Sequence, residues 1–415
     1  GSGVLAISDT EDNQDVTFAG DVSAVALTTT GNLYDVIFQE DVTVTTDVTF
    51  AAIRNLDIGG ATDDIATFTG GLDTTTNVTG TVTIAGTINT TNTQMDLGAV
   101  TLAAATTLDT GNAAAGVLNV GAVTSGTNAL TLDSGSTAGA TIGLTSFADA
   151  SGGLTIRDAG GLVTLGDIGS GAAGAVTITD STSGVTFSAN VDATTLTITD
   201  TEDAASVTFA NGQDVDITTG FTVSNAGSDA YNVVINSSTF DAAGDTNFLN
   251  EGTLTLGNGG DTLTFAGGLS TDGNGGADLP STVTLSGTIN TTNTQMDLGA
   301  VTLAGTTVLD TGNHASGILN VGAVTSATNA LTLDSGATAG ATIGLGSFVD
   351  ASGGLTIRDA GGLVTLGDIG SGAAGAVTIT DSTSGVTFSA NVDATTLTIT
   401  DTEDAASVTF ANGQD

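Results

Sequence analysis

Short triplets of apolar, threonine and apolar residues decide the fold of this chain. Residues 154–209 read LTIRDAGGLVTLGDIGSGAAGAVTITDSTSGVTFSANVDATTLTITDTEDAASVTF. Two series of triplets recur there: 154–156, 176–178 and 196–198, and 163–165, 185–187 and 207–209. Alternating apolar and β-branched polar residues are typical of half-buried strands, and the intervening Gly, Asn, Asp and Ser are turn residues. The stretch therefore predicts short strands that repeat about every 22 residues.

These triplets belong to a longer repeat. Residues 81–214 form the first copy of a repeat core and align without a gap to residues 282–415, the second copy, with 12 differences in 134 positions. Residues 1–80 are a partial, divergent copy, and residues 215–281 hold divergent coils between the two cores. Because both ends of the sequence fall inside a repeat, we expect these residues to be part of a longer array.

A unit of about 22 residues is too short to close a hydrophobic core alone, whereas stacked units can share one. We therefore predict an all-β, elongated β-solenoid with coils of about 22 residues, stacked about 4.8 Å apart. Equivalent apolar residues would form buried ladders, such as Ile156, Ile178 and Ile198, or Leu165, Phe187 and Phe209. The alternative is a series of tandem β-sandwich domains, which leaves the short spacing unexplained.

Composition excludes several classes of function. The chain has 45 acidic residues, three arginines, no lysine and a net charge of −42, so it repels nucleic acid and anionic membrane surfaces. It has no cysteine for disulfides or zinc sites, and no apolar run long enough to insert into a membrane as a helix. Its one histidine, His314, is replaced by Ala113 in the earlier copy. We therefore expect no enzymatic activity and no organic cofactor.

The repeat register predicts rows of carboxylates. The expected members are Asp158, Asp180 and Asp200 in the first copy and Asp359, Asp381 and Asp401 in the second. Carboxylates about 5 Å apart repel one another, so each row must splay into water, raise some pKa values or bind a cation. Ca²⁺ is the expected ion because it is hard and accepts flexible oxygen ligands. Splayed, solvated aspartates are the alternative.

A second candidate metal site is local. Asp272, Asn274 and Asp278 place oxygen side chains in a segment that resembles part of a calcium loop, but the closing Glu of an EF-hand is missing. Residues 257–263 read GNGGDTL and resemble one fragment of the Gly/Asp nonapeptide of calcium β-rolls. For both segments the alternative is an ordinary turn.

Tandem triplets, Gly/Asp/Asn turns and near-identical long repeats together resemble the β-strand-repeat regions of large bacterial surface proteins. These include filamentous-haemagglutinin-like adhesins, repetitive surface-layer proteins and extracellular fibre proteins. The resemblance implies export, an extracellular or cell-surface location and a structural or adhesive role. We therefore expect a structural subunit of an extracellular filament, sheath or surface layer that associates with itself. The alternative is the stalk of a large surface adhesin, with cell-surface glycans among its partners.

Overall fold

The protein folds into stacked coils of short β-strands. The structure, a computed structural model, describes residues 3–8, 10–46, 48–226, 229–272, 279–349, 351–403 and 405–413. Within those ranges it has two short 3-10 segments, η1 (Ala150–Gly152) and η3 (Ala351–Gly353), and neither an α-helix nor any helix that could cross a bilayer. The described strands are arranged as stacked β-solenoid coils of about 23 residues each. The predicted all-β solenoid is therefore confirmed.

The chain divides into two units, Gly1–Val207 and Thr208–Asp415, and the boundary falls within β22 (Ser206–Phe209). Each unit has three columns of parallel strands, which we call faces 1, 2 and 3 and number separately in each unit. One coil of unit 1 passes along face 1 at residues 95–97, face 2 at 100–102 and face 3 at 106–109 before it returns to face 1 at residue 118.

The strands of unit 1 belong to these faces as follows. Face 1 holds β10 (Leu72–Asp73), β12 (Met95–Leu97), the first parts of β14 (Leu118–Thr124), β16 (Ile142–Ala148) and β18 (Val163–Ile168), and β20 (Val185–Phe187). Face 2 holds β2 (Asp15–Phe18), β5 (Asp35–Phe38), β8 (Leu56–Ile58), the first parts of β11 (Val82–Thr90) and β13 (Val100–Asp109), the last parts of β14, β16 and β18, and the start of β21 (Val191–Ile198). Face 3 holds β3 (Val22–Ala24), β6 (Val42–Val44), β9 (Ile65–Phe68), the last parts of β11 and β13, β15 (Leu130–Gly135), β17 (Leu154–Ala159), β19 (Gly174–Ile178) and the end of β21. A separate three-stranded sheet holds β1 (Val4–Ile7), β4 (Ala26–Thr29) and β7 (Val48–Thr49).

Unit 2 repeats this arrangement. Face 1 holds β26 (Thr246–Asn247), β29 (Leu269–Ser270), β31 (Met296–Leu298), the first parts of β33 (Leu319–Thr325), β35 (Ile343–Val349) and β37 (Val364–Ile369), β39 (Val386–Phe388) and β41 (Val408–Phe410). Face 2 holds β24 (Tyr231–Ile235), β27 (Glu251–Leu256), the first parts of β30 (Thr282–Asn290) and β32 (Val301–Asp310), and the last parts of β33, β35 and β37. Face 3 holds the start of β23 (Asp214–Val223), β25 (Thr239–Ala242), β28 (Thr262–Phe265), the last parts of β30 and β32, β34 (Leu331–Asp334), β36 (Leu355–Ile357), β38 (Gly375–Ile379) and β40 (Ala394–Ile399).

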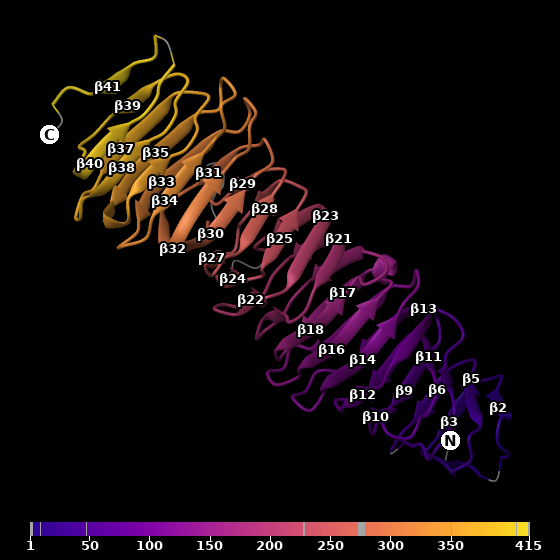
Figure 1. The fold of residues 1–415 in the computed structure, drawn as a ribbon. Coiled ribbons are helices and arrows are strands. Elements are labelled where there is room, and N and C mark those ends of the chain that lie inside the picture. Colours follow the sequence, from indigo (N-terminus) through magenta and orange to yellow (C-terminus); the bar gives the residue numbers. More distant parts are fainter. Residues whose placement is uncertain are drawn as a thin grey trace. The chain divides into compact units, whose positions relative to one another are not determined.

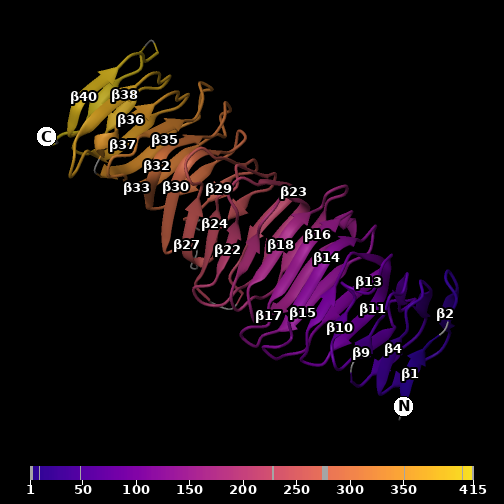
Figure 2. The ribbon, with the colours of Figure 1, turned by 60° about the horizontal axis from the view of Figure 1, so that its bottom comes forward.

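The two ribbon views show the stacking inside each unit. In unit 1, β14, β16 and β18 lie side by side in both views (Figure 1, Figure 2). In unit 2, β33, β35 and β37 do the same. Strand neighbours are therefore about one coil apart in sequence, which is the arrangement that the short repeat predicts. Parallel pairing between coils also rules out the tandem β-sandwich alternative, whose sheets are antiparallel.

The three faces enclose an apolar interior because alternate side chains of each strand point inward. Leu154 and Ile156 are fully buried, and Thr155 between them is partly exposed. The predicted isoleucine ladder is confirmed in unit 1, where Ile156 pairs with Ile178 and Ile178 with Ile198. Full burial of such a side chain stabilises the fold by about 1.5–3 kcal/mol.

The predicted phenylalanine ladder is seen most completely in unit 2. There Leu366, Phe388 and Phe410 are consecutive partners, and the rings of Phe388 and Phe410 stack with centroids 4.8 Å apart. In unit 1, Leu165 pairs with Phe187. Phe209 belongs to unit 2. The sequence period therefore places equivalent residues one above another within each unit.

Candidate functional site

A row of aspartates lies along face 3 of unit 1. Asp109 is the register partner of Asp133, and Asp133 is the partner of Asp158. Unit 2 has the same row, with Asp310 paired to Asp334. Asp109, Asp133, Asp310 and Asp334 each follow an inward-pointing leucine, so strand alternation directs their side chains away from the interior. Asp158 comes two residues after Ile156, at a shift in the pairing register. Neighbouring coils therefore bring negative charges together at one edge of the solenoid.

Arginine neutralises part of each row. In unit 1, Arg157 Nε donates to Asp133 Oδ2 at 2.5 Å, and Arg157 Nη2 lies 3.5 Å from Asp109 Oδ2. In unit 2, Arg358 Nε donates to Asp334 Oδ2, and its Nη2 lies 3.1 Å from Asp310 Oδ2. Each arginine thus links its own coil to the two preceding coils, and the neighbouring Asp334 carboxylate raises the pKa of Arg358.

The remaining arginine does the same near the start of unit 1. Arg54 binds Asp35 with two hydrogen bonds, Nε to Oδ1 at 2.7 Å and Nη2 to Oδ2 at 2.6 Å. Arg54 Nη2 also lies 3.9 Å from Asp15 Oδ1, one coil further back. This bidentate pair holds the pKa of Asp35 below its ordinary value of 3.8. All three arginines of the chain therefore form ion pairs with aspartates of the two preceding coils.

The aspartates predicted as a calcium row continue these rows. Asp158, Asp180 and Asp200 each come two residues after Ile156, Ile178 and Ile198, which are paired, so they occupy equivalent positions in consecutive coils. Partial burial raises the pKa of Asp158, and the charges of Asp180 and Asp133 raise it further.

The second copy behaves in the same way. Partial burial raises the pKa of Asp359, as do the charges of Asp334 and Asp381, whereas Asp401 is exposed. In each row one carboxylate therefore has a raised pKa, with burial as the larger cause and the charges of neighbouring carboxylates as the smaller one. In the part of the chain that the structure describes, no group of three or more His, Asp or Glu side chains is placed to hold a metal ion. Calcium binding by these rows stays a prediction.

The residues of the two local candidate metal sites either belong to turns or fall outside the described residues. Asp272 is partly buried and accepts a hydrogen bond from Ser270 Oγ at 3.1 Å, while Asn274 and Asp278 lie outside the described residues. In the segment 257–263, Asp261 Oδ2 accepts the backbone N–H of Asn258 at 2.7 Å, so this carboxylate stabilises its own turn. His314 is exposed, and its Nδ1 accepts the N–H of Ser316 at 3.2 Å.

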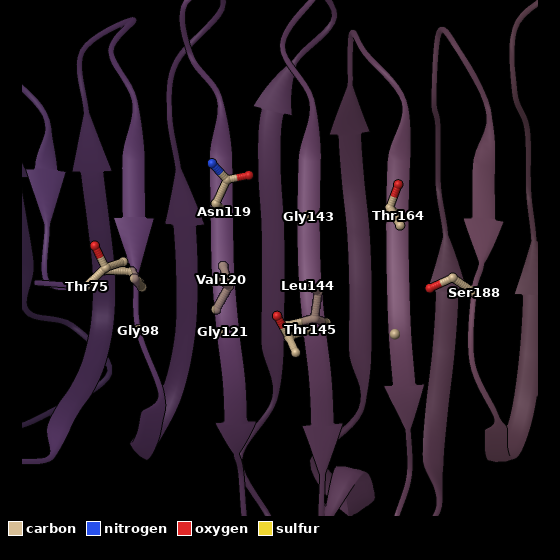
Figure 3. A pocket seen from close by; sticks show the side chains of 12 residues that line it. Thr75, Gly98, Asn119, Val120, Gly121, Gly143, Leu144, Thr145, Thr164 and Ser188 are labelled. Atoms are coloured by element: carbon tan, nitrogen blue, oxygen red, sulfur yellow. The ribbon is translucent and has the colours of Figure 1, made fainter.

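A groove that we did not predict runs across face 1 at the same place in both units. In unit 1 its volume is about 570 Å³, and in unit 2 it is about 490 Å³. Figure 3 shows that the unit 1 groove crosses several neighbouring strands and has small and polar side chains along it. The lining residues in unit 1 are Thr75, Leu97, Gly98, Asn119, Val120, Gly121, Gly143, Leu144, Thr145, Thr164, Gly166 and Ser188.

Glycines form the groove because the coils approach closely there. A Cβ on Gly166 would lie 1.9 Å from the carbonyl oxygen of Thr145, and one on Gly121 would lie 2.6 Å from that of Gly98. A signal for this groove was present in the sequence, because glycine recurs at the equivalent position of successive coils. In unit 1 that position holds Gly98, Gly121, Thr145 and Gly166, and in unit 2 it holds Gly299, Gly322, Gly346 and Gly367. The groove is thus a repeated surface feature. Its polar side chains in unit 1 are Asn119, three threonines and Ser188, and the unit 2 groove also has Asp272.

No protein-family model, curated protein or solved structure matches this chain.

Proposed function

We propose that the chain is a non-enzymatic structural subunit of an extracellular filament, sheath or surface layer, and that it assembles with copies of itself. The proposal rests on the observation that the same surface features occur in both copies of the long repeat. The groove of face 1 and the arginine-linked aspartate row both occur twice, once in each copy of the long repeat. A catalytic site requires one special place, whereas a scaffold requires many equivalent contacts.

The charge of the chain fits such a role outside the cell. A net charge of −42 keeps individual chains soluble and apart at low ionic strength. Screening by salt reduces this repulsion, because the Debye length falls to about 8 Å at physiological ionic strength. The absence of cysteine in the sequence means that folding requires no disulfide chemistry in an oxidising compartment. The cell-surface location rests on the resemblance to β-strand-repeat surface proteins.

Electron microscopy of the purified chain tests the proposal. Samples at several protein concentrations and at about 0.15 M salt should contain ordered polymers or sheets, and their sedimentation should depend on protein concentration. Single, unassociated particles at every concentration and salt level would overturn self-assembly. That result would favour the adhesin-stalk alternative, for which binding of this chain to cell-surface glycans is the next measurement.

A further inference from the structure

Face 1 carries almost no charge, although the net charge of the chain is −42. In unit 1, Asp96 is the only charged residue of the five segments that form this face from β12 to β20, and in unit 2 Asp297 is the only one from β31 to β39. The other faces of the same coils carry aspartates, such as Asp133 on face 3 and Asp167 on face 2. We call each set of five segments a neutral strip: 94–98, 117–121, 141–145, 162–166 and 184–188 in unit 1, and 295–299, 318–322, 342–346, 363–367 and 385–389 in unit 2.

Each segment of a neutral strip has three outward positions, because side chains alternate along a strand. In the segment 162–166 these positions hold Leu162, Thr164 and Gly166, while the residues between them are buried. Leu162 is 45% exposed, and its counterpart Leu363 in unit 2 is 43% exposed. Pairing between coils aligns the outward positions of unit 1 into three columns: a first column of Gln94, Val117, Thr141, Leu162 and Gly184, a middle column of Asp96, Asn119, Gly143, Thr164 and Thr186, and a last column of Gly98, Gly121, Thr145, Gly166 and Ser188.

The first and last columns are complementary in size. In Figure 3 three middle-column residues form a row across β14, β16 and β18, and the last column lies on the groove side of that row. Where the first column has a large residue the last column has glycine in three coils, and where the first column has glycine the last column has serine. Within single coils the pairs are Gln94 and Gly98, Val117 and Gly121, Leu162 and Gly166, and Gly184 and Ser188; in unit 2 they are Gln295 and Gly299, Ile318 and Gly322, Leu363 and Gly367, and Gly385 and Ser389.

We propose that a second copy of the chain covers the neutral strip, so that the strips of two copies pack face to face. A two-fold axis that runs along the middle column, between the two sheets, places each first-column residue opposite the last-column residue of the same coil in the other copy. Leu162 of each copy then faces Gly166 of the other and enters its groove. Packed sheets lie about 10 Å apart, a gap that a leucine opposite a glycine fills. This inference rests on the proposed self-assembly and specifies an isologous contact for it.

Charge favours a second copy as the occupant. The cores of protein interfaces are depleted of charge, as the neutral strip is. A cationic partner is attracted to the aspartate rows of face 3 instead, and an anionic partner is repelled by the net charge. Asp96 is the exception within the strip: it accepts hydrogen bonds from Gln94 Nε2 at 2.7 Å and Asn119 Nδ2 at 2.8 Å, and the two-fold axis brings it toward Asp96 of the other copy. Salt should therefore strengthen the contact by screening this repulsion.

The area of the strip makes one contact weak. Five coils about 4.8 Å apart and five residues of about 3.3 Å each cover about 400 Å², whereas stable interfaces bury about 800 Å² on each partner. Several strips that bind together strengthen association without any new kind of contact. Because each long repeat supplies one strip, affinity should rise with the number of repeats.

Crosslinking of an engineered cysteine tests the two-fold axis. Thr164 lies in the middle column, so it meets the same residue of the other copy. The sequence has no cysteine, so the variant T164C has no background reaction. A short bismaleimide should join T164C into dimers about tenfold faster than T101C, the matched control, because Thr101 is an equally exposed threonine on face 2.

Charged variants separate this contact from assembly in general. Leu162→Asp with Leu363→Asp alters two exposed side chains, so folding should persist, as circular dichroism and melting can verify, while association falls about tenfold or more. The matched control is Leu33→Asp with Ile65→Asp, at side chains outside the strips that are 43% and 47% exposed, and it should leave association nearly unchanged. Asp96→Asn with Asp297→Asn should strengthen association, because it removes the facing carboxylates.

The outcomes distinguish this contact from the proposed function. Equal association of the leucine variant and its control, with equal crosslinking of T164C and T101C, would overturn this contact and leave self-assembly by another surface standing. Retention on an immobilised neutral polysaccharide that the leucine variant loses, without T164C dimers, would assign the strip to a glycan and also overturn the contact. A chain that never associates would overturn both proposals.

Discussion

Residues 193–212 and 394–413 have identical sequences but different surroundings. Leu196 and Phe209 are fully buried in the first segment, whereas Leu397 and Phe410 are 37% and 55% exposed in the second. Local sequence therefore sets the strand pattern and which side chains point inward, but burial depends on whether another coil lies above. In a solenoid, stability belongs to the interface between neighbouring coils as much as to the coil itself.

The largest difference in stability effects should appear when the equivalent leucines of the two segments, Leu196 and Leu397, are each replaced by alanine. Leu196→Ala removes a fully buried side chain and should reduce the free energy of unfolding by about 2–5 kcal/mol. Leu397→Ala affects a partly exposed side chain in an identical sequence and should cost less than about half as much. Denaturant unfolding of both variants measures the difference. Equal losses would show that burial by a neighbouring coil does not determine stability.

Replacement of glycine by alanine should likewise destabilise the protein at a crowded position and have little effect at an open one. Gly166→Ala places a Cβ 1.9 Å from a carbonyl oxygen, so its coil must shift, at a cost of about 1–3 kcal/mol. Gly20→Ala is the matched control, because a Cβ there meets no atom within 4 Å. The melting temperature should fall clearly for Gly166→Ala and change little for Gly20→Ala. A similar change in both would contradict the close approach of coils beneath the groove.

Removal of one carboxylate should change stability by a smaller amount. The change should differ between the aspartate row of unit 1 and the exposed β40–β41 coil. Because the pKa of Asp158 is raised in the folded protein, its ionisation opposes folding at neutral pH. Asp158→Asn should therefore stabilise the fold by a few tenths to about 1 kcal/mol after solvent screening. Asp401→Asn, at an exposed position of the β40–β41 coil, should have almost no effect. Destabilisation by Asp158→Asn would contradict the view that burial and the charges of Asp180 and Asp133 disfavour the ionised form of Asp158.

The same pKa shifts predict the dependence of stability on pH. The penalty from Asp158 and Asp359 is present above their raised folded pKa values and disappears as the pH falls through them toward the ordinary value of 3.8. Asp35 has a lowered pKa, so its contribution is present above 3.8 and is lost as the pH falls below that value. Thermal melts should show that Asp158→Asn loses its advantage over the parent chain on acidification, whereas Asp35→Asn loses its deficit.

Calcium should have the smallest effect. If Asp158 and Asp180 bind Ca²⁺, a Ca²⁺ concentration equal to the dissociation constant adds about 0.4 kcal/mol to the free energy of unfolding. The melting temperature in Ca²⁺ should then exceed that in NaCl of matched ionic strength, and Asp158→Asn together with Asp359→Asn should reduce the difference. Equal melting temperatures in the two salts would remove the calcium prediction.

The register of the core was predictable because inward-pointing residues repeat with the coil. The spacing of Ile156, Ile178 and Ile198 in the sequence matches their pairing, including the shorter step from Ile178 to Ile198. The same period placed Asp158 and Asp180 in neighbouring coils. These predictions succeeded because in-register stacking converts sequence spacing directly into spatial neighbours.

The arginine links and the groove were not predicted. Arg157 bonds to carboxylates one and two coils earlier, and nothing in its own triplet marks these partners. These ion pairs can be predicted only when Asp109 and Asp133 are recognised as members of the same aspartate row. The groove depends on how closely the coils approach, which the glycine period indicates but does not measure. Whether an ion occupies the rows depends on hydration and side-chain geometry, which strand periodicity does not specify.

A disulfide between neighbouring coils tests the in-register stacking of the solenoid most directly. Thr155 and Thr177 are register partners in consecutive coils, so the double variant T155C/T177C should close an intramolecular disulfide readily in dilute solution. The double variant T155C/T186C is the control, because Thr186 pairs with Thr164 on another face. Stacking of the coils in this register predicts a rapid, nearly complete disulfide in the first variant and little in the second. Failure of the first pair to close in the folded protein, or equal closure of both, would contradict the stacking of coils in this register.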